Sequence, residues 1–354
     1  MSVETRPEAA ADSTGPEGVG LGGIPRQLRQ VRRDFLVALE PVRPSVYRYC
    51  RSLTGTVWDA EDLLQETLTK ALAEASQRHE PIRNVQAWLI RIATNTWLDT
   101  LRRSSRTTVQ DFTDPVMDLP DDGAADPLAP LAVESALGRL VLLLAPRERA
   151  CVVLKDVFGY SLAEIAGMLG SNPGAVKSAL HRGRTALRAG AAPAGAAAAA
   201  ATTDAARPGR GTAHPLLLRR LADAFNSCDI DAMVRLFLAD GRTEVVGNVS
   251  ETGHEEIRTG SLDHTFGPDA PETYRATVHR FDGEEVILLW ERPKDKPDAA
   301  EVVADVLRLD CTESAPGEDA LIRELKWYFF CPELLSEVAG GLGLPFKTNG
   351  VSYF

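Results

Sequence analysis

Positive charge is concentrated on one short stretch of a chain that is acidic as a whole. Residues 171–188, SNPGAVKSALHRGRTALR, contain no acidic side chain, and their basic side chains are Lys177, Arg182, Arg184 and Arg188. The complete chain of 354 residues carries a formal net charge of −11. Lysine and arginine neutralise phosphates, and such contacts supply most of the sequence-independent affinity for nucleic acid. Because charge acts by patch and not by sum, this segment predicts a nucleic-acid-binding helix.

The residues around this stretch predict two helices joined by a tight turn. Ser161 and Glu164 have the spacing of a capping box, which starts a helix that ends near residue 169. Gly170 supplies the turn. Asn172 can then cap the second helix, and Pro173 occupies its first position, where the missing N–H costs nothing.

This layout is typical of a helix-turn-helix. The small Ala166 and the apolar Val176 occupy positions at which the two helices cross closely. Such motifs place the second helix in the major groove of DNA. An ordinary helical hairpin with a charged face is the alternative. If the motif is real, the side chains available to DNA are Lys177, Ser178, His181, Arg182 and Arg184.

A helix is also predicted over 58–75, WDAEDLLQETLTKALAEA. Leu64, Leu68 and Leu72 follow one another at steps of four and form a buried stripe. A second, partly acidic face is formed by Asp62, Gln65, Glu66 and Thr69. This face either binds a partner or is simply solvated.

After a polar loop at 77–84, the segment 85–106 predicts another helix. Its inner stripe is Val85, Leu89, Ile92 and Thr96, and its polar face carries Trp88, Arg91, Asn95 and Arg102, with Arg103 and Arg106 beyond. An aromatic ring beside basic and amide groups suits a surface that holds phosphates and stacks bases. The alternative places Trp88 and Trp97 in the core and explains the arginines by the dipole at the end of the helix.

Two biased segments divide the chain. Residues 107–138 contain seven acids, four prolines and no Lys or Arg, and residues 189–213 are mostly Ala, Gly and Pro. Both predict linkers. With a disordered lead-in at 1–25, they leave two helical blocks, 26–106 and 139–188, and a mixed block, 214–354.

The composition argues against several classes of protein. No apolar run approaches the roughly 20 residues of a membrane helix, and the N-terminal residues lack the pattern of a signal peptide. The five cysteines are odd in number and form no CxxC pair, which argues against a disulfide framework and against a zinc site. We therefore expect a cytoplasmic protein with no metal, cofactor or membrane contact.

The two helical blocks together resemble a bacterial sigma factor of the extracytoplasmic-function, sigma-70-like type. DAEDLLQETLTKAL is similar to the helix by which this family binds core RNA polymerase. NVQAWLIRIATNTWLDTLRRSSR is similar to the segment that binds the promoter −10 element, and residues 146–188 resemble the domain that reads the −35 element. The resemblance thus implies sigma region 2 at 26–106 and region 4 at 139–188.

The resemblance also implies roles for single residues. Asp62, Gln65 and Glu66 would contact core polymerase. The −10 element would be held by Asn84, Trp88, Arg91, Asn95, Arg102 and Arg103, and the −35 element by Gly174, Lys177, Ser178, His181, Arg182 and Arg184. In the family, the counterpart of the acidic linker threads polymerase channels built for nucleic acid. Two positions depart from the pattern: Ser171 replaces a usual apolar residue, and Ala175 a usual hydroxyl residue.

The third block predicts a cone-shaped α+β domain. HPLLLRRLADAFNSCDIDAMVRLFLADGRTEVVG reads as two helices split at 226–229 and then a strand. Four more strands are expected at 272–281, 284–292, 300–311 and 319–330. The tail at 331–354 is either the last helix and strand of this domain or an arm that packs on the sigma domains.

This block resembles the SnoaL-like, nuclear-transport-factor-2-like fold, chiefly in LADAFNSCDIDAMVRLFLADGRTEVVG. The fold implies an apolar pocket, and its enzymes place an Asp–His or Asp–Arg pair there. No spacing brings together the available residues, His254, His264, His279, Asp263 and Asp305. We therefore predict no catalytic residues. A regulatory role is expected, either through intramolecular docking on the sigma domains or through a small-molecule ligand.

These features favour a sigma factor, not an enzyme, whose fused C-terminal domain modulates it. One alternative is a ligand-responsive helix-turn-helix regulator that binds DNA without polymerase. Another is a SnoaL-like enzyme with accessory helical domains. Residues 1–106 discriminate, because a regulator that only occupies an operator has no use for the polar faces of 58–75 and 85–106.

Overall fold

The computed structural model describes residues 24–78, 80–105, 140–190, 215–268, 270, 272–296, 298–312 and 320–351. The predicted lead-in, the acidic linker and the Ala/Gly/Pro linker lie wholly or largely outside these residues. Among the described residues, no helix is long and apolar enough to cross a membrane.

The N-terminal unit consists of α1 (Ile24–Leu39), α2 (Arg43–Thr54), α3 (Val57–Ser76) and α4 (Val85–Ser105). The helices predicted at 58–75 and 85–106 are therefore confirmed. Thr56 starts α3 by accepting a hydrogen bond from the Asp59 N–H, 3.1 Å between N and Oγ1. Leu64 and Leu89 are buried between the helices, as their stripes predicted.

The second helical unit has the predicted helix-turn-helix geometry. It comprises α6 (Pro146–Val152), the π-helical segment η3 (Val153–Val157), α7 (Leu162–Met168) and α8 (Pro173–Ala189). Ser161 and Glu164 form both bonds of the capping box, and Asn172 caps α8. Gly170 adopts the left-handed conformation that its turn requires, with φ of 60°. The Ser171 N–H closes the turn on the Ala166 carbonyl at 2.9 Å, so the departure at Ser171 leaves the turn intact.

The C-terminal unit is an α+β domain with one six-stranded sheet in the order β2-β1-β6-β5-β4-β3. The pair β1–β6 is parallel and the other pairs are antiparallel. Its helices are α10 (Pro215–Asn226), α11 (Ile230–Val234), α12 (His254–Ile257), η4 (Arg258–Leu262), α13 (Asp263–Phe266) and α14 (Pro332–Gly341). Its strands are β1 (Phe237–Val245), β2 (Val249–Thr252), β3 (Glu272–Phe281), β4 (Glu284–Pro293), β5 (Val302–Cys311) and β6 (Ile322–Trp327).

This architecture confirms the expected SnoaL-like cone, and the predicted strands lie close to the observed ones. Strand β2 and the short helices between residues 254 and 266 were not predicted, because these segments lack a clear periodicity. The tail combines both alternatives. The segment after α14 returns to the sheet, where Phe346 bridges to Val303, while α14 itself packs between β5 and α3.

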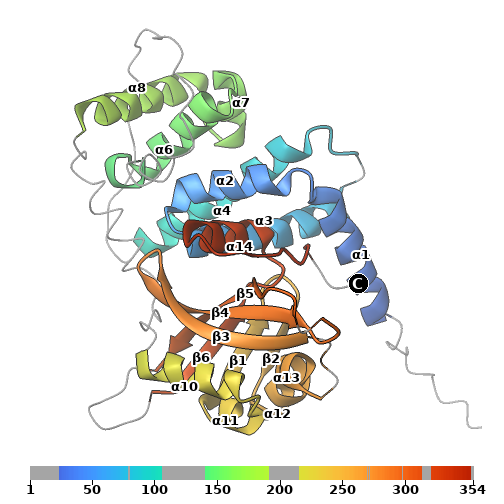
Figure 1. Ribbon diagram of the computed structural model, residues 1–354. Helices are drawn as coiled ribbons and strands as arrows, with labels where there is room; N and C mark the ends of the chain where they lie inside the picture. The colour runs from blue at the N-terminus through green and yellow to red at the C-terminus, as the bar shows by residue number, and fades with distance from the viewer. Residues whose placement is uncertain are drawn as a thin grey trace, which may run out of the picture.

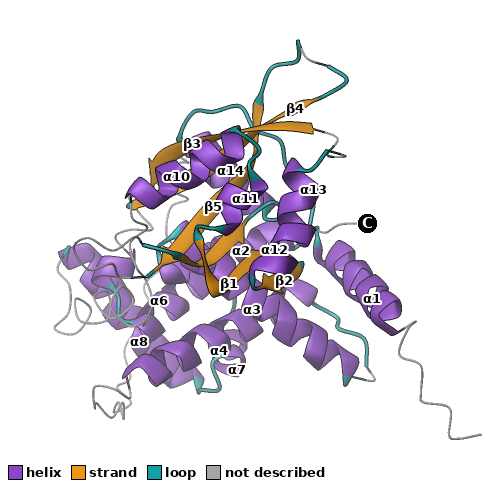
Figure 2. Ribbon diagram, turned by 90° about the horizontal axis from the view of Figure 1, so that it is seen from below, coloured by secondary structure: helices purple, strands orange, loops and turns teal. Residues whose placement is uncertain are grey.

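The molecule is built in layers, with α6–α8 above α2–α4 and the sheet below them (Figure 1). Helices α10–α13 cover the face of the sheet that points away from α2–α4, and the view from below shows the same helices in front of the sheet (Figure 2). That face has its own core around Phe225, Phe266 and Trp327. The other face of the sheet shares one continuous core with both helical units, to which Val306 and Leu335 contribute.

Candidate functional site

The predicted partner-binding face of α3 lies against the C-terminal domain. Asp62 forms an ion pair with Lys326 of β6, 3.0 Å between Oδ1 and Nζ. Their side chains are only 17% and 20% exposed. Although burial alone lowers the pKa of Lys326, Asp62 and neighbouring carboxylates raise it above its usual value, so the lysine is held charged. Asp62 is therefore covered in this conformation.

The two neighbouring predicted contacts differ in accessibility. Gln65 donates to Glu61 at 2.6 Å and lies against the β1–β2 turn, where a Cβ at Gly247 would be 2.7 Å from its Oε1. Glu66, in contrast, is 44% exposed and pairs with Lys70 within the helix. The C-terminal domain thus covers two of the three side chains predicted to bind a partner.

A second charged strip joins α2 to α14 with the opposite polarity. Arg43 lies between two carboxylates, 3.0 Å from Glu61 and 2.8 Å from Glu333 of α14. One helical turn later, the Tyr47 hydroxyl donates to Glu337 of α14 at 2.9 Å. These contacts, together with those of Asp62 and Gln65, form what we call the docking interface.

Aromatic contacts fill the centre of the docking interface. The ring of Trp58, buried on α3, lies 5.6 Å from that of Tyr328, and the Arg308 guanidinium stands 5.6 Å over the same tryptophan. Arg308 is fixed by Glu284, 3.0 Å between Nη2 and Oε1. Such desolvated aromatic and guanidinium groups are the type of residue that dominates binding energy at interfaces.

The structure corrects the placement of Trp88. This side chain is 7% exposed, and its indole N–H donates to Glu74 at 3.0 Å. The same carboxylate binds Arg91 at 2.7 Å. Trp88 is therefore a core residue of the bundle, as the alternative had it, because a carboxylate on α3 satisfies its one polar group. Its ring is not offered to bases in this conformation.

The other residues predicted to hold the −10 element lie nearer the surface. Asn84 is exposed, and its Oδ1 caps α4 by accepting from the Ala87 N–H at 3.0 Å. Asn95 is half-buried on α4. Near the end of that helix, Arg102 and Arg103 are exposed and both donate to Asp99, and the helix dipole favours cations at this end.

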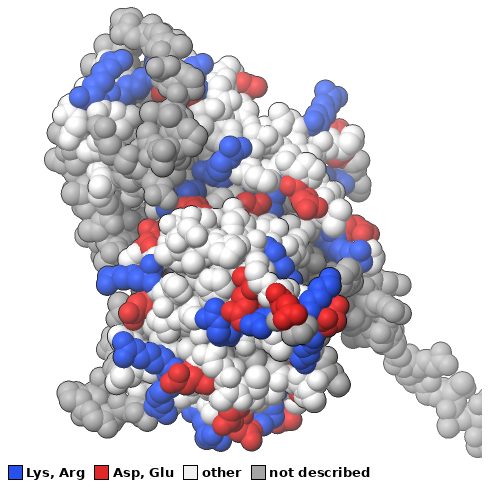
Figure 3. Space-filling model, viewed as in Figure 1, with Lys and Arg blue, Asp and Glu red and all other residues white. Residues whose placement is uncertain are grey.

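Helix α8 brings most of its predicted residues to one side. His181 and Arg182 are exposed, Lys177 and Gly174 are half-buried, and blue side chains mark this edge of the molecule (Figure 3). Arg182 is 2.8 Å from Glu148. Arg184 is 2.6 Å from Asp156.

Ser178 is an exception to the prediction for α8. It is 6% exposed, and its hydroxyl donates to the Gly174 carbonyl at 3.1 Å within the helix. Ser178 belongs to the buried side of α8, together with Val176, Ala179 and Leu180. Ser178 is therefore buried in this conformation, unlike His181 and Arg182 on the same helix.

A buried arginine that no sequence pattern predicted links the two helical units, in addition to the packing of Tyr49 on Phe158. Arg149 of α6 donates to the Leu53 carbonyl at the end of α2 and to Val141 O at 2.8 Å. Its guanidinium also lies 5.4 Å over the ring of Trp97. Burial lowers the pKa of Arg149 to about 10, which leaves it charged at neutral pH.

The residues considered for catalysis lie in different parts of the C-terminal domain. The ring of His254 contacts the Phe237 carbonyl on β1, and that of His279 contacts Thr277 on β3. Asp305 is buried within β5, where its Oδ1 accepts from the Val306 N–H at 2.7 Å. The far core of the cone is filled by stacked Phe225 and Phe266, 4.8 Å between ring centroids.

Asp305 gives a first testable prediction. Its second carboxyl oxygen has no hydrogen-bond partner among the described residues, and burial raises its pKa well above the usual range. The raised pKa means that stability is lost as pH rises from about 4 through the folded-state pKa. We expect Asp305→Asn to stabilise the protein by about 1–3 kcal/mol at pH 7 and to abolish this pH dependence. Urea unfolding between pH 4 and 8 tests both effects, and equal slopes for parent and variant would contradict the assignment.

Comparison with known families identifies both helical units. Residues 39–107 match the model of Sigma-70 region 2, and residues 134–187 match that of Sigma-70, region 4. The chain is 35% identical over 148 residues to the ECF RNA polymerase sigma factor SigL of Mycobacterium tuberculosis, covering 40% of this chain and 80% of SigL.

Two further similarities extend over more of the chain. The ECF RNA polymerase sigma factor SigG of M. tuberculosis is 33% identical over 238 residues, which cover 60% of this chain. The chain spans 62% of the length of SigG. The crystal structure of M. tuberculosis extracytoplasmic function sigma factor SigJ is 20% identical, covers 82% of this chain and 95% of SigJ, and superposes with a TM-score of 0.29.

Proposed function

This chain belongs to the ECF family of RNA polymerase sigma factors, and on that premise we propose that it binds core RNA polymerase and directs initiation at specific promoters. One observation carries the proposal: the models of region 2 and region 4 match one chain in the order that a sigma factor requires. In this proposal α3 binds core polymerase, α4 binds the −10 element and α8 binds the −35 element. The site of action is then the cytoplasm, where the polymerase works.

We further propose that the C-terminal domain restrains the sigma domains and has no catalytic role. The ion pair between Asp62 and Lys326 and the contact of Gln65 with Gly247 support this, because they occupy the proposed polymerase-binding face of α3. A side chain cannot serve both partners at once, so docking and polymerase binding compete. The core between the sheet and α10–α13 is built of apolar side chains, among them the stacked Phe225 and Phe266, and this composition favours a non-catalytic role.

Charge reversal on α3 tests the polymerase-binding proposal. We expect Asp62→Lys combined with Glu66→Lys to reduce co-purification with bacterial core RNA polymerase at least tenfold, because two attractive contacts become repulsive. Glu255→Lys is the matched control, since Glu255 is exposed on α12, far from α3 in the sequence and in the fold. Retention of polymerase by the α3 variant at the level of the control would contradict the assignment of this face.

Binding to duplex DNA separates this proposal from an operator-binding regulator. Region 4 packs on region 2 through Arg149 and the docked C-terminal domain holds the α3 side. We therefore expect the free protein to bind promoter duplex poorly and non-specifically, and to bind it tightly only with core polymerase. Nanomolar, sequence-specific binding by the free protein, measured by fluorescence anisotropy at 0.15 M salt, would favour the regulator.

A further inference from the structure

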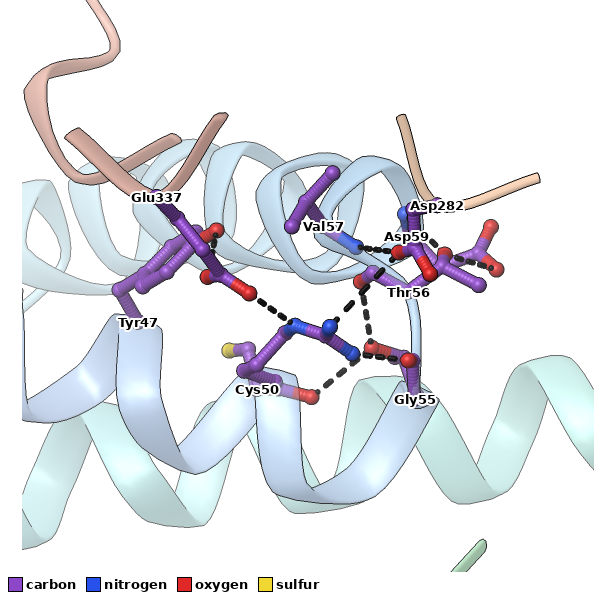
Figure 4. Close-up of polar contacts among 10 residues, drawn as sticks. Tyr47, Cys50, Gly55, Thr56, Val57, Asp59, Asp282 and Glu337 are labelled. Carbon is purple, nitrogen blue, oxygen red and sulfur yellow. Dashed lines mark hydrogen bonds and ion pairs between the residues drawn. The ribbon is translucent and has the colours of Figure 1, made fainter. Parts of the chain in front are cut away.

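Arg51, on α2, links the C-terminal domain to the turn between α2 and α3. Its Nε is 2.8 Å from Glu337 of α14, and its Nη2 is 3.6 Å from Asp282 in the β3–β4 turn. Its remaining Nη1 donates to the Gly55 carbonyl, in the turn itself. Figure 4 shows Glu337 reaching α2 and Asp282 reaching the start of α3 from two separate elements of the C-terminal domain.

Asp282 holds the same turn at a second point. Its carboxylate accepts a hydrogen bond from the Val57 N–H, the first residue of α3, at 3.0 Å (Figure 4). Asp282 has a positive φ of 49° and is followed by Gly283, as in a tight two-residue hairpin. The hairpin tip of the C-terminal domain therefore adds a second cap to α3, beside the local cap from Thr56.

Region 4 packs against this same turn from the other side. Gly55 ends α2 with φ of 91°, and a Cβ there would lie only 2.7 Å from the Val141 side chain, in the segment that leads into α6. Arg149 bonds both the Val141 carbonyl and the Leu53 carbonyl, two residues before Gly55. Residues 53–57 are thus clamped between the C-terminal domain and region 4.

We propose that Arg51 couples two contacts of region 2, the one with the C-terminal domain and the one with region 4. Release of the C-terminal domain then also loosens region 4 from region 2. When the carboxylates of Glu337 and Asp282 leave, the guanidinium loses the groups that orient it towards the Gly55 carbonyl. Three contacts with the C-terminal domain are then lost at this turn: the ion pairs of Arg51 with Glu337 and with Asp282, and the hydrogen bond from the Val57 N–H to Asp282. The packing of the turn against Val141 weakens as a result. Because coupling between sites is reciprocal, loosening region 4 also weakens docking.

This inference rests on the proposed function, since it adds a second effect of the docked C-terminal domain: it also holds region 4 against region 2. Polymerase binding would be freed at α3, and the two DNA-binding units would be freed from each other by the same event. Arg51 acts as a positioning residue in this scheme, and it contacts neither polymerase nor DNA.

A double-mutant cycle on the full-length chain tests the coupling. Cysteines introduced at the exposed positions Ala73 of α3 and Ala163 of α7 carry spin labels. Pulsed electron paramagnetic resonance then measures the distance between the two helical units. Cys228, the exposed cysteine, is first replaced by serine, because the other four cysteines are buried. Four proteins are compared: the parent, Lys326→Glu, Arg51→Met and the double variant.

Lys326→Glu is expected to release the C-terminal domain, which a second label pair at Ala73 and Lys296 verifies. We expect it to raise the fraction of molecules with separated helical units about five- to tenfold, and Arg51→Met to do the same. In the Arg51→Met background, Lys326→Glu should then add less than about twofold, because the link is already broken.

Two outcomes would overturn the coupling. One is release of the C-terminal domain with no change in the Ala73–Ala163 distance. The other is a double variant in which the separated fraction rises by the product of the two single increases, because the two changes would then act independently. Arg48→Met is the matched control, since Arg48 is an exposed arginine on the same helix. If Arg51→Met does not fold, Asp282→Asn with Glu337→Gln replaces it in the cycle. No polymerase or DNA enters the measurement, so failure of the coupling is distinguishable from failure of the proposed function.

Discussion

Reversing the charge of Lys326 is expected to increase the affinity of the full-length chain for core RNA polymerase roughly tenfold or more. Lys326→Glu places a carboxylate beside Asp62 and close to Glu324 and Glu244, in a site that is mostly screened from water. Removing one partner of a buried ion pair costs about 3–5 kcal/mol, and repulsion adds to that cost. Since polymerase would bind only the released form, its apparent affinity rises with the released fraction. Titration of core polymerase with a fluorescent protein measures it directly.

A charge swap separates release from a direct effect on polymerase. Asp62→Lys with Lys326→Glu restores an ion pair of reversed direction, so the C-terminal domain should dock again. Polymerase binding should then be low, because the docked domain covers α3 again and because α3 carries the reversed charge. Lys296→Glu, on an exposed loop of the same domain, is the control for net charge. If the swap binds polymerase as tightly as Lys326→Glu alone, the competition for Asp62 is refuted.

The polarity of the docking interface explains why docking has one register. The α2 strip offers Arg43 and Arg51 to the acidic helix α14, whereas the neighbouring α3 strip offers Asp62 to the basic Lys326. A sideways displacement of the C-terminal domain that placed α14 over α3 would bring the carboxylates of α14 against Asp62, which costs affinity. The alternation therefore selects one arrangement over its neighbours.

Local sequence signals predicted what depends on local physics. The capping box of Ser161 and Glu164, the cap at Asn172 and the positive φ at Gly170 each follow from residues within four positions of one another. The strands of the C-terminal domain were likewise visible as short β-branched runs. Spacing alone did not predict that Trp88 and Ser178 are buried in this conformation. The burial of Trp88 depends on the carboxylate of Glu74, which accepts from its indole N–H.

The docking interface could not be predicted in this way. Asp62 and Lys326 are separated by 264 positions, and a solvated acidic face of α3 would have had the same sequence. The same limit applies to Arg51, whose three contacts lie on α14, on the β3–β4 turn and at the end of its own helix. Periodicity shows which side of a helix is polar, but it does not show which distant element neutralises that side.

Truncating Arg43 is expected to cause a large loss of stability at the docking interface. Arg43 is 3% exposed and lies between Glu61, which is fully buried, and Glu333 of α14. Arg43→Met leaves a buried carboxylate without its cation, which costs about 3–5 kcal/mol in the free energy of unfolding. Arg48→Met, an exposed change one turn along α2, should cost within about 0.5 kcal/mol. Urea unfolding at pH 7 compares the two.

The pH dependence of this loss identifies its cause. Burial raises the pKa of Glu61 above its usual value, although Arg43 and Gln65 lower it, so removing Arg43 must raise it further. A raised carboxyl pKa contributes stability that is present below about pH 4.3 and is lost as pH rises through the folded-state pKa. The penalty of Arg43→Met should therefore be largest at neutral pH and shrink towards pH 5. Adding Glu61→Gln should recover most of it, whereas a penalty that is constant with pH and unchanged by Glu61→Gln would mean that Arg43 acts by packing alone.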